Sequence, residues 1–216
     1  MNISPAWFEQ GRGDVNLFQY TANLADLAFK DPNHQLFVSS ELQRPDKAVL
    51  KWMENTKQSM VLLGAIMSIV QPELYHTGQL ALEKLFNEPN YVNRQVELFE
   101  ALEVWWTPFS AMTVVSNRET PLHRDMGGRV EWSDMLIALG NYDHGRFALP
   151  GLGLRYRYNP GTILAFSGKA FQHGATCPGN RACIALYMRD NVIKRLKLPT
   201  PSWLDVRDYA DGTESH

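Results

Sequence analysis

A histidine and a carboxylate stand two residues apart in the segment Leu122-His123-Arg124-Asp125. In an extended chain, side chains at positions i and i+2 point to the same face, so an imidazole nitrogen and a carboxylate oxygen can reach one metal ion. A His-x-Asp pair alone occurs by chance in many proteins. It predicts a metal site only if a third ligand comes from elsewhere in the chain.

His173 is the candidate for that third ligand. It follows a β-rich run at residues 162–166 and the turn Ser167-Gly168. At this place in the chain His173 can lie on a neighbouring strand and reach the same ion. Two histidines and one carboxylate occupy one face of an octahedral Fe(II) and leave positions for a bidentate cosubstrate and for dioxygen. We therefore predict that His123, Asp125 and His173 bind iron. The alternative is that His173 is an ordinary loop histidine.

Arg181 opens the apolar run 182–187, eight residues after His173. An arginine on a strand that faces the inside of a barrel needs a buried anion as its partner. The planar guanidinium binds a carboxylate through two parallel hydrogen bonds and stays charged, which suits the far carboxylate of 2-oxoglutarate. Taken alone, Arg181 reads as a surface arginine at a turn, but its spacing after the histidine favours the anchoring role.

The elements that must position these residues divide the chain into two parts. Apolar residues recur at helical spacing between residues 46 and 85, with a break at Gln71-Pro72, and again over residues 91–105. We expect at least three helices there. After Pro108, short β-rich runs separated by glycine, proline and asparagine predict strands at residues 111–116, 135–139, 146–149, 154–158, 162–166 and 181–189.

This order predicts an α+β fold whose strands form a sandwich or barrel. We expect one domain over residues 1–216, with mainly helical support to about residue 106 and a β core over about residues 107–197. The helices would cover one face of the β core. The polar residues 205–216 are expected to form a frayed tail.

Charge is unevenly distributed along the chain. Residues 117–197 carry 12 Lys plus Arg against 6 Asp plus Glu, a balance of +6, so the remainder carries 9 against 17, or -8. This asymmetry fits a basic substrate face beside an acidic scaffold, and it also fits chance. The longest apolar stretch, residues 60–70, is shorter than the roughly 20 residues of a membrane helix.

The N-terminal residues and the number of cysteines predict where the protein is located and whether its cysteines are reduced. The first residues carry no basic lead and no apolar block, which predicts an intracellular protein. Two cysteines, Cys177 and Cys183, are too few for a disulfide framework or a zinc cage, and we expect both to be reduced thiols.

Longer motifs then point to one family. The segments VVSNRETPLHRDMGGRVEWSDMLIALGNY, FALPGLGLRYRYNPGTILAFSGKAFQHG and GNRACIALYMRDNV resemble the TET/JBP class of 2-oxoglutarate oxygenases, especially its fungal members. The resemblance spans about residues 105–192. It includes, in order, SNRxTPxHRD, PGT, SGK, the second histidine and GNRxCxA, and this combination is more specific than any one motif.

The resemblance implies a double-stranded β-helix (jelly-roll) core that uses Fe(II), 2-oxoglutarate and O2. His123, Asp125 and His173 would ligate the iron, and Arg181 would hold the far carboxylate of 2-oxoglutarate. Arg118 would face the other carboxylate, although from the residues alone it could equally pair with the neighbouring Glu119. Related enzymes flip a methylated base out of duplex DNA. The polar positions expected to help read the base are Arg189 and Asn191, and the alternative is that these two residues form a solvated strand end.

The resemblance also implies a substrate, 5-methylcytosine in DNA, oxidised to the hydroxymethyl, formyl and carboxyl products, and with it a nuclear location. One alternative is demethylation of N6-methyladenine in the same site, and another is an inactive β-barrel that only binds. The oligomeric state is left open. Candidates for phosphate contacts are the arginines at 124, 129, 155 and 157 and the cluster at Lys194, Arg195 and Lys197.

Overall fold

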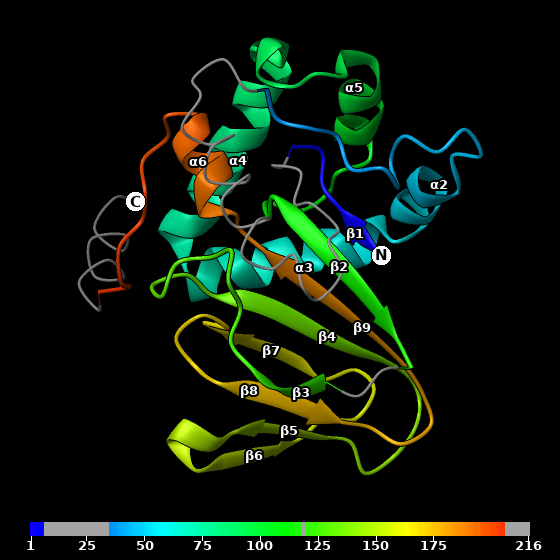
Figure 1. Cartoon of the computed structure of the whole chain (residues 1–216), viewed down its shortest axis with the longest axis vertical. Coiled ribbons are helices and arrows are strands. Elements are labelled where there is room, and N and C mark those ends of the chain that lie inside the picture. The colour runs from blue at the N-terminus through cyan, green and yellow to red at the C-terminus, as the bar shows by residue number, and fades with distance from the viewer. Residues whose placement is uncertain (7–34, 118–119, 206–216) are drawn as a thin grey trace, which may run out of the picture.

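The structure is a computed structural model, and it describes residues 1–6, 35–117 and 120–205. Among the described residues a short N-terminal strand comes first, the helices follow, and the remaining strands come after them, as Figure 1 shows. In the part of the chain that the structure describes, four α-helices precede the strand-rich part: α2 (Ala48–Asn55), α3 (Lys57–Val70), α4 (Pro72–Asn87) and α5 (Gln95–Glu103). The predicted break at Gln71-Pro72 is confirmed, because Pro72 occupies the first turn of α4, where its missing N–H costs nothing.

The strands form two antiparallel sheets. The five-stranded sheet has the order β1-β2-β9-β4-β7 and the four-stranded sheet has the order β3-β8-β5-β6. The strand bounds are β1 (Asn2–Ile3), β2 (Ala111–Ser116), β3 (Thr120–His123), β4 (Asp134–Asn141), β5 (Arg146–Leu149), β6 (Leu154–Arg157), β7 (Ile163–Phe166), β8 (His173–Thr176) and β9 (Asn180–Tyr187). The predicted α+β class is confirmed, and the strands form the two sheets of a sandwich.

Most expected strands are present, with one correction at the end of the last one. The predicted strand 181–189 is wrong in its final residues, because β9 ends at Tyr187 and a helix, α6 (Asp190–Arg195), follows. Asp190 lies in the first turn of α6 and Lys194 in the last, where each charge complements the helix dipole. Their side chains also form an ion pair of 2.6 Å one turn apart.

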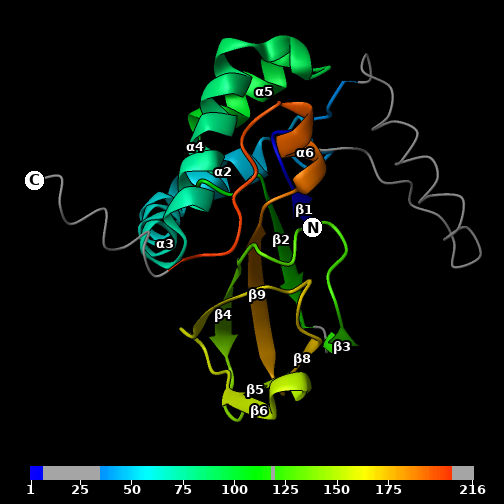
Figure 2. The same ribbon diagram turned by 90° about the vertical axis from the view of Figure 1, so that its left-hand side faces the viewer.

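Side chains alternate along β9 and give the five-stranded sheet two different faces. Ile184 and Leu186 belong to the core that the sheet shares with the helices. Cys183 and Tyr187 point the other way and line a cavity between the two sheets. The turned view shows the helices gathered on one side of the strands (Figure 2), so the predicted helical cover of one face is confirmed.

A second, smaller core fills the space between the sheets beyond the cavity. It contains the buried Phe147 of β5 and Tyr158, which follows β6, together with Ala138 of β4 and Ala175 of β8. The rings of Phe147 and Tyr158 are tilted by 57° to each other, with centroids 5.3 Å apart. This core fixes the spacing of the two sheets because its aromatic side chains reach from one sheet to the other.

The domain division and the C-terminal tail were also predicted from the sequence. The division into one domain with helical support and a β core stays a prediction, and residues 206–216 of the expected tail lie outside the described residues. In the part of the chain that the structure describes, no helix combines the length and the apolar character needed to cross a membrane.

Gly78 of α4 provides a test of how the helices pack on the strand-rich part. A Cβ atom at this position would overlap the backbone carbonyl of Pro108, so the helix fits only without a side chain. Alanine favours an isolated helix by about 1 kcal/mol over glycine. We nevertheless expect Gly78→Ala to lower the free energy of unfolding by about 1–3 kcal/mol through overpacking, as measured by urea denaturation. The exposed neighbour Gln79→Ala is the control, and a stabilised Gly78→Ala would contradict this packing.

Candidate metal centre and cosubstrate cavity

Strand pairing brings the two histidines together. His123 ends β3 and His173 begins β8, and the two are partners across the strand pair. Their ring centroids lie 4.3 Å apart. Asp125 follows β3, with Oδ1 3.4 Å from His123 Nε2 and Oδ2 3.7 Å from His173 Nε2. The described residues thus contain the predicted group of three, with one potential ligand atom each, all within 4.8 Å of one another.

In each histidine, a backbone carbonyl determines which ring nitrogen carries the proton and which one is free to bind a metal ion. His123 Nδ1 lies 2.9 Å from the Pro121 carbonyl, and His173 Nδ1 lies 3.1 Å from the Phe171 carbonyl. Because a carbonyl only accepts, each Nδ1 must carry the proton and donate it. Each Nε2 is then left with a lone pair that faces Asp125, which is the arrangement of a metal-binding histidine.

Burial also favours the neutral form of His173. The residue is 3% exposed, and loss of solvent lowers the pKa of its imidazole below the ordinary value, while the Phe171 carbonyl and Asp125 act in the opposite direction. Metal–ligand bonds of about 2.1 Å place two ligands of one ion at most about 4.2 Å apart. The three side chains therefore need only small rotations to share an ion, and two imidazoles with one carboxylate are a donor set that suits Fe(II).

A second carboxyl lies beside this group. Asp134, at the start of β4, is 9% exposed and accepts a hydrogen bond of 3.0 Å from the Gly168 N–H. Burial, together with the nearby Asp125 carboxylate, raises the pKa of Asp134 to about 7. Sequence reasoning missed this residue. Its only signal was an acidic residue at the start of an otherwise apolar strand.

Arg181 lies at one end of the same cavity. It is 5% exposed, and its guanidinium carbon is 5.6 Å from the centre of the Tyr158 ring. Asn117 fixes its backbone on both sides: the Asn117 N–H donates to the Arg181 carbonyl, and the Arg181 N–H donates to Asn117 Oδ1, each at 2.8 Å. Asn117 has φ 47°, a left-handed conformation that asparagine tolerates better than most residues. The asparagine of the SNR motif was not identified from sequence as a positioning residue.

Burial raises the pKa of the Tyr158 hydroxyl, and the neighbouring Cys183 thiol acts in the same direction. The hydroxyl therefore stays protonated. It lies 3.3 Å from Cys183 Sγ. Cys177 and Cys183 are both free thiols, as expected.

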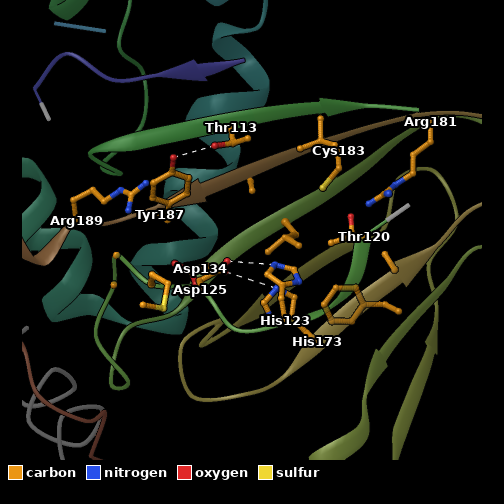
Figure 3. Close-up of a pocket in the computed structure, with 18 residues that line it drawn as sticks. Thr113, Thr120, His123, Asp125, Asp134, His173, Arg181, Cys183, Tyr187 and Arg189 are labelled. Atoms are coloured by element: carbon orange, nitrogen blue, oxygen red, sulfur yellow. Dashed lines mark hydrogen bonds and ion pairs between the residues drawn. The ribbon is translucent and has the colours of Figure 1, made fainter. Parts of the chain in front are cut away.

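The other end of the cavity is formed by Tyr187 and Arg189. The Arg189 guanidinium carbon is 4.7 Å from the centre of the Tyr187 ring, and the Tyr187 hydroxyl lies 2.9 Å from that of Thr113. Arg181 and Tyr187 are six residues apart on one strand, which corresponds to roughly 20 Å. Figure 3 shows the histidines and Asp125 between these two ends. The volume of the cavity is about 340 Å³.

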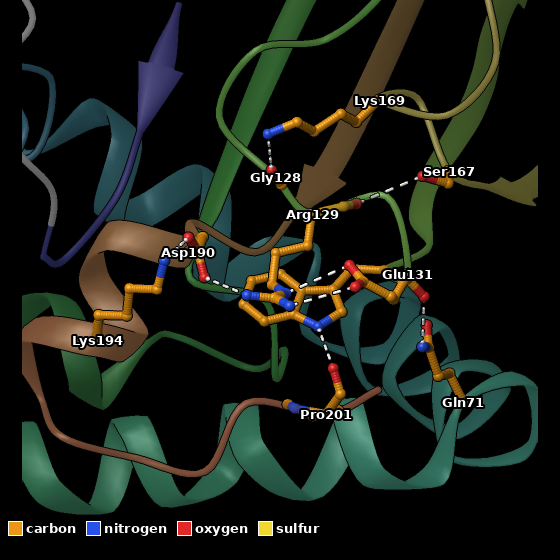
Figure 4. Close-up of polar contacts among 10 residues, drawn as sticks. Gln71, Gly128, Arg129, Glu131, Ser167, Lys169, Asp190, Lys194 and Pro201 are labelled. Carbon is orange, nitrogen blue, oxygen red and sulfur yellow. Dashed lines mark hydrogen bonds and ion pairs between the residues drawn. The ribbon is translucent and has the colours of Figure 1, made fainter. Parts of the chain in front are cut away.

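The remaining predicted positions fall in three places. Arg189 lines the cavity, whereas Asn191 lies in α6 and is not among the described residues that line it. Arg118 lies outside the described residues, so its cosubstrate role stays a prediction. Arg129 forms ion pairs with Glu131 and Asp190 (Figure 4). Among the arginines proposed for phosphate contacts, the exposed ones are Arg124, Arg155 and Arg157.

Comparison with known proteins places this site in a family. Residues 29–190 match the model of the Tet_JBP family, described as the oxygenase domain of the 2OGFeDO superfamily. No curated protein matches the chain. Among solved structures, NgTET1 in complex with 5mC DNA is similar, with a TM-score of 0.53 and 12% sequence identity. The match covers 86% of this chain and 66% of the NgTET1 chain, and at this identity it shows the fold alone.

The family match spans most of the chain and includes His123, Asp125, His173 and Arg181. The family assignment inferred from the sequence motifs is confirmed. The protein therefore belongs to the Tet_JBP family of oxygenase domains and is an Fe(II)- and 2-oxoglutarate-dependent dioxygenase.

Proposed function

We propose that this dioxygenase acts on DNA and oxidises the methyl group of 5-methylcytosine to the 5-hydroxymethyl, formyl and carboxyl products. The proposal rests on one cavity. In it, the three metal-binding side chains lie between the buried Arg181 and Tyr187, and the Arg189 guanidinium covers the ring of Tyr187. NgTET1, whose fold is similar, has been solved with 5mC DNA. A DNA substrate also suggests a nuclear location.

His123, Asp125 and His173 hold the iron in this proposal. The two Nε2 atoms and the Asp125 carboxylate approach from one side, which leaves the cavity side for the cosubstrate and for dioxygen. The backbone carbonyls that accept from the two Nδ1 atoms keep both rings in the required tautomer. When bound, iron and 2-oxoglutarate supply the oxidising power, with release of succinate and CO2.

Arg181 binds the far carboxylate of 2-oxoglutarate. It lies at the buried end of the cavity, where there is little access for water. Two parallel hydrogen bonds from the guanidinium to a carboxylate are strong in such surroundings. Asn117 holds the arginine backbone and thereby fixes the distance between this anchor and the metal ligands. Arg118, next in the sequence, is proposed to contact the other carboxylate.

The substrate base enters at the opposite end. A cytosine inside a duplex cannot bring its methyl group to a buried metal, so the base must leave the stack, at a cost of a few kcal/mol. Tyr187 offers an aromatic surface and Arg189 offers hydrogen-bond donors beside it. We propose that these two side chains receive the flipped base, and that Asn191 acts only indirectly because it lies away from the cavity.

The substrate assignment is tested by mass spectrometry of nucleosides. Duplexes that carry 5-methylcytosine or N6-methyladenine are incubated with the protein, Fe(II), ascorbate and 2-oxoglutarate. We expect oxidised cytosines with the unmodified protein and none with His123→Ala or Asp125→Ala, since each removes a metal ligand. Demethylated adenine alone would move the assignment to the N6-methyl substrate, and the absence of both products and of succinate would favour a barrel that only binds.

Arg181 is tested by a substitution that keeps the charge. Arg181→Lys retains the positive charge but loses the planar fork, so we expect the KM for 2-oxoglutarate to rise about 10- to 100-fold. Succinate formation at varied 2-oxoglutarate concentration measures this change. Arg44→Lys, exposed in the helical part, is the matched control and should leave the KM unchanged. An unaltered KM in Arg181→Lys would place the cosubstrate elsewhere.

Arg124 is the phosphate-contact candidate nearest the metal ligands. It is exposed, and both of its sequence neighbours line the cavity. We expect Arg124→Ala to weaken binding to all duplexes by a similar factor and to reduce the slope of log K against log salt by about one. Fluorescence anisotropy at several salt concentrations gives both values. Arg44→Ala, exposed in the helical part, serves as the control, and equal slopes for the two variants would exclude Arg124.

A further inference from the structure

The turn Ser167-Gly168-Lys169, between β7 and β8, contacts the segment that follows β3 through each of its three residues. Ser167 Oγ donates to the Arg129 carbonyl at 3.4 Å, and Lys169 Nζ donates to the Gly128 carbonyl at 2.8 Å (Figure 4). Between them, the Gly168 carbonyl accepts from the Asp125 N–H at 3.0 Å. This SGK motif has no part in the metal, cosubstrate or base contacts proposed above.

Gly168 lies between two carboxyl groups. Its carbonyl accepts from the backbone of Asp125, and its N–H donates to Asp134 Oδ2 at 3.0 Å. A Cβ atom here would overlap Asp125 Oδ2 and lie 2.7 Å from Asp134 Oδ2. The Asp125 side chain is short, so its carboxylate would have to leave its position to make room for this Cβ atom. Glycine is therefore required by the position of the carboxylates and not by the conformation of the turn.

Asp125 needs such support because strand pairing does not hold it. It follows the last residue of β3, and its side chain is 46% exposed. His123 and His173, by contrast, are fixed by the pairing of β3 with β8. The link from buried Asp134 through the Gly168 backbone to the Asp125 N–H is thus a connection between the ligand and β4 of the five-stranded sheet.

We propose that Gly168 and Asp134 are positioning residues that hold the Asp125 carboxylate where it binds iron. Asp134 accepts from the Gly168 N–H, the Gly168 carbonyl accepts from the Asp125 N–H, and the missing side chain of Gly168 leaves room for the carboxylate. This inference rests on the proposed role of Asp125 as a metal ligand. Lys169 holds Gly128 instead, on the wall of the cavity, so its contact is separable from that of Gly168.

Mn(II) affinity of the full chain, measured by electron paramagnetic resonance without 2-oxoglutarate, tests the proposal independently of any DNA substrate. Residues that orient a metal ligand typically change metal affinity 10- to 100-fold when substituted. We expect a weakening of about that size for Gly168→Ala and for Asp134→Leu, which removes the acceptor and excludes water. Asp134→Asn should bind nearly as the unmodified protein does, because its amide oxygen still accepts. Lys169→Met is the matched control and should bind normally.

Circular dichroism of each metal-free variant separates loss of the site from loss of the fold. Folded Gly168→Ala and Asp134→Leu variants with unchanged Mn(II) affinity would overturn the proposal. If Gly168→Ala does not fold, the comparison of Asp134→Leu with Asp134→Asn decides.

Asp134→Leu should have no further effect in an Asp125→Ala background, and an equal weakening there would show that Asp134 does not act through Asp125. Asp125→Ala alone with full Mn(II) affinity would instead refute the ligand role itself.

Discussion

The pairing of β3 with β8 is the constraint on which the site depends, because it sets His123 opposite His173. β3 is an edge strand, and its register with β8 shifts between Thr120 and His123. Such irregularities occur at sheet edges and re-aim side chains near active sites. Pro121 fits this position because an edge strand tolerates a missing N–H, and its carbonyl then accepts from His123 Nδ1.

Burial divides the site into a dry side and an open side. His173 and Arg181 are almost fully buried, whereas the side chains of His123 and Asp125 are 39% and 46% exposed. Electrostatic contacts are stronger where water is excluded, so the dry side suits a small dicarboxylate that must bind in one orientation. A polymer can approach only from the open side. The distribution of solvent therefore supports the proposal that 2-oxoglutarate binds beside the buried Arg181 and that DNA approaches from the exposed side of the metal ligands.

β9 connects these features with the rest of the fold. It lies in the middle of the five-stranded sheet, paired with β2 and β4, and it places Arg181 and Tyr187 at opposite ends of the cavity. Its other face packs on the helices through Ile184 and Leu186. The helices thus support the strand on which both ends of the site are built, which gives a physical role to the acidic part of the chain without requiring it to contact DNA.

The sequence by itself determined the residue types of the site and the local elements, because side-chain periodicity and turn residues act over a few positions. The helical break at Gln71-Pro72 and strand β2 were both predicted in this way. Only the tertiary structure decided which strands pair, and hence that His123 faces His173 and that Gly168 fits between Asp125 and Asp134. These contacts join residues far apart in the chain, and no local pattern records them.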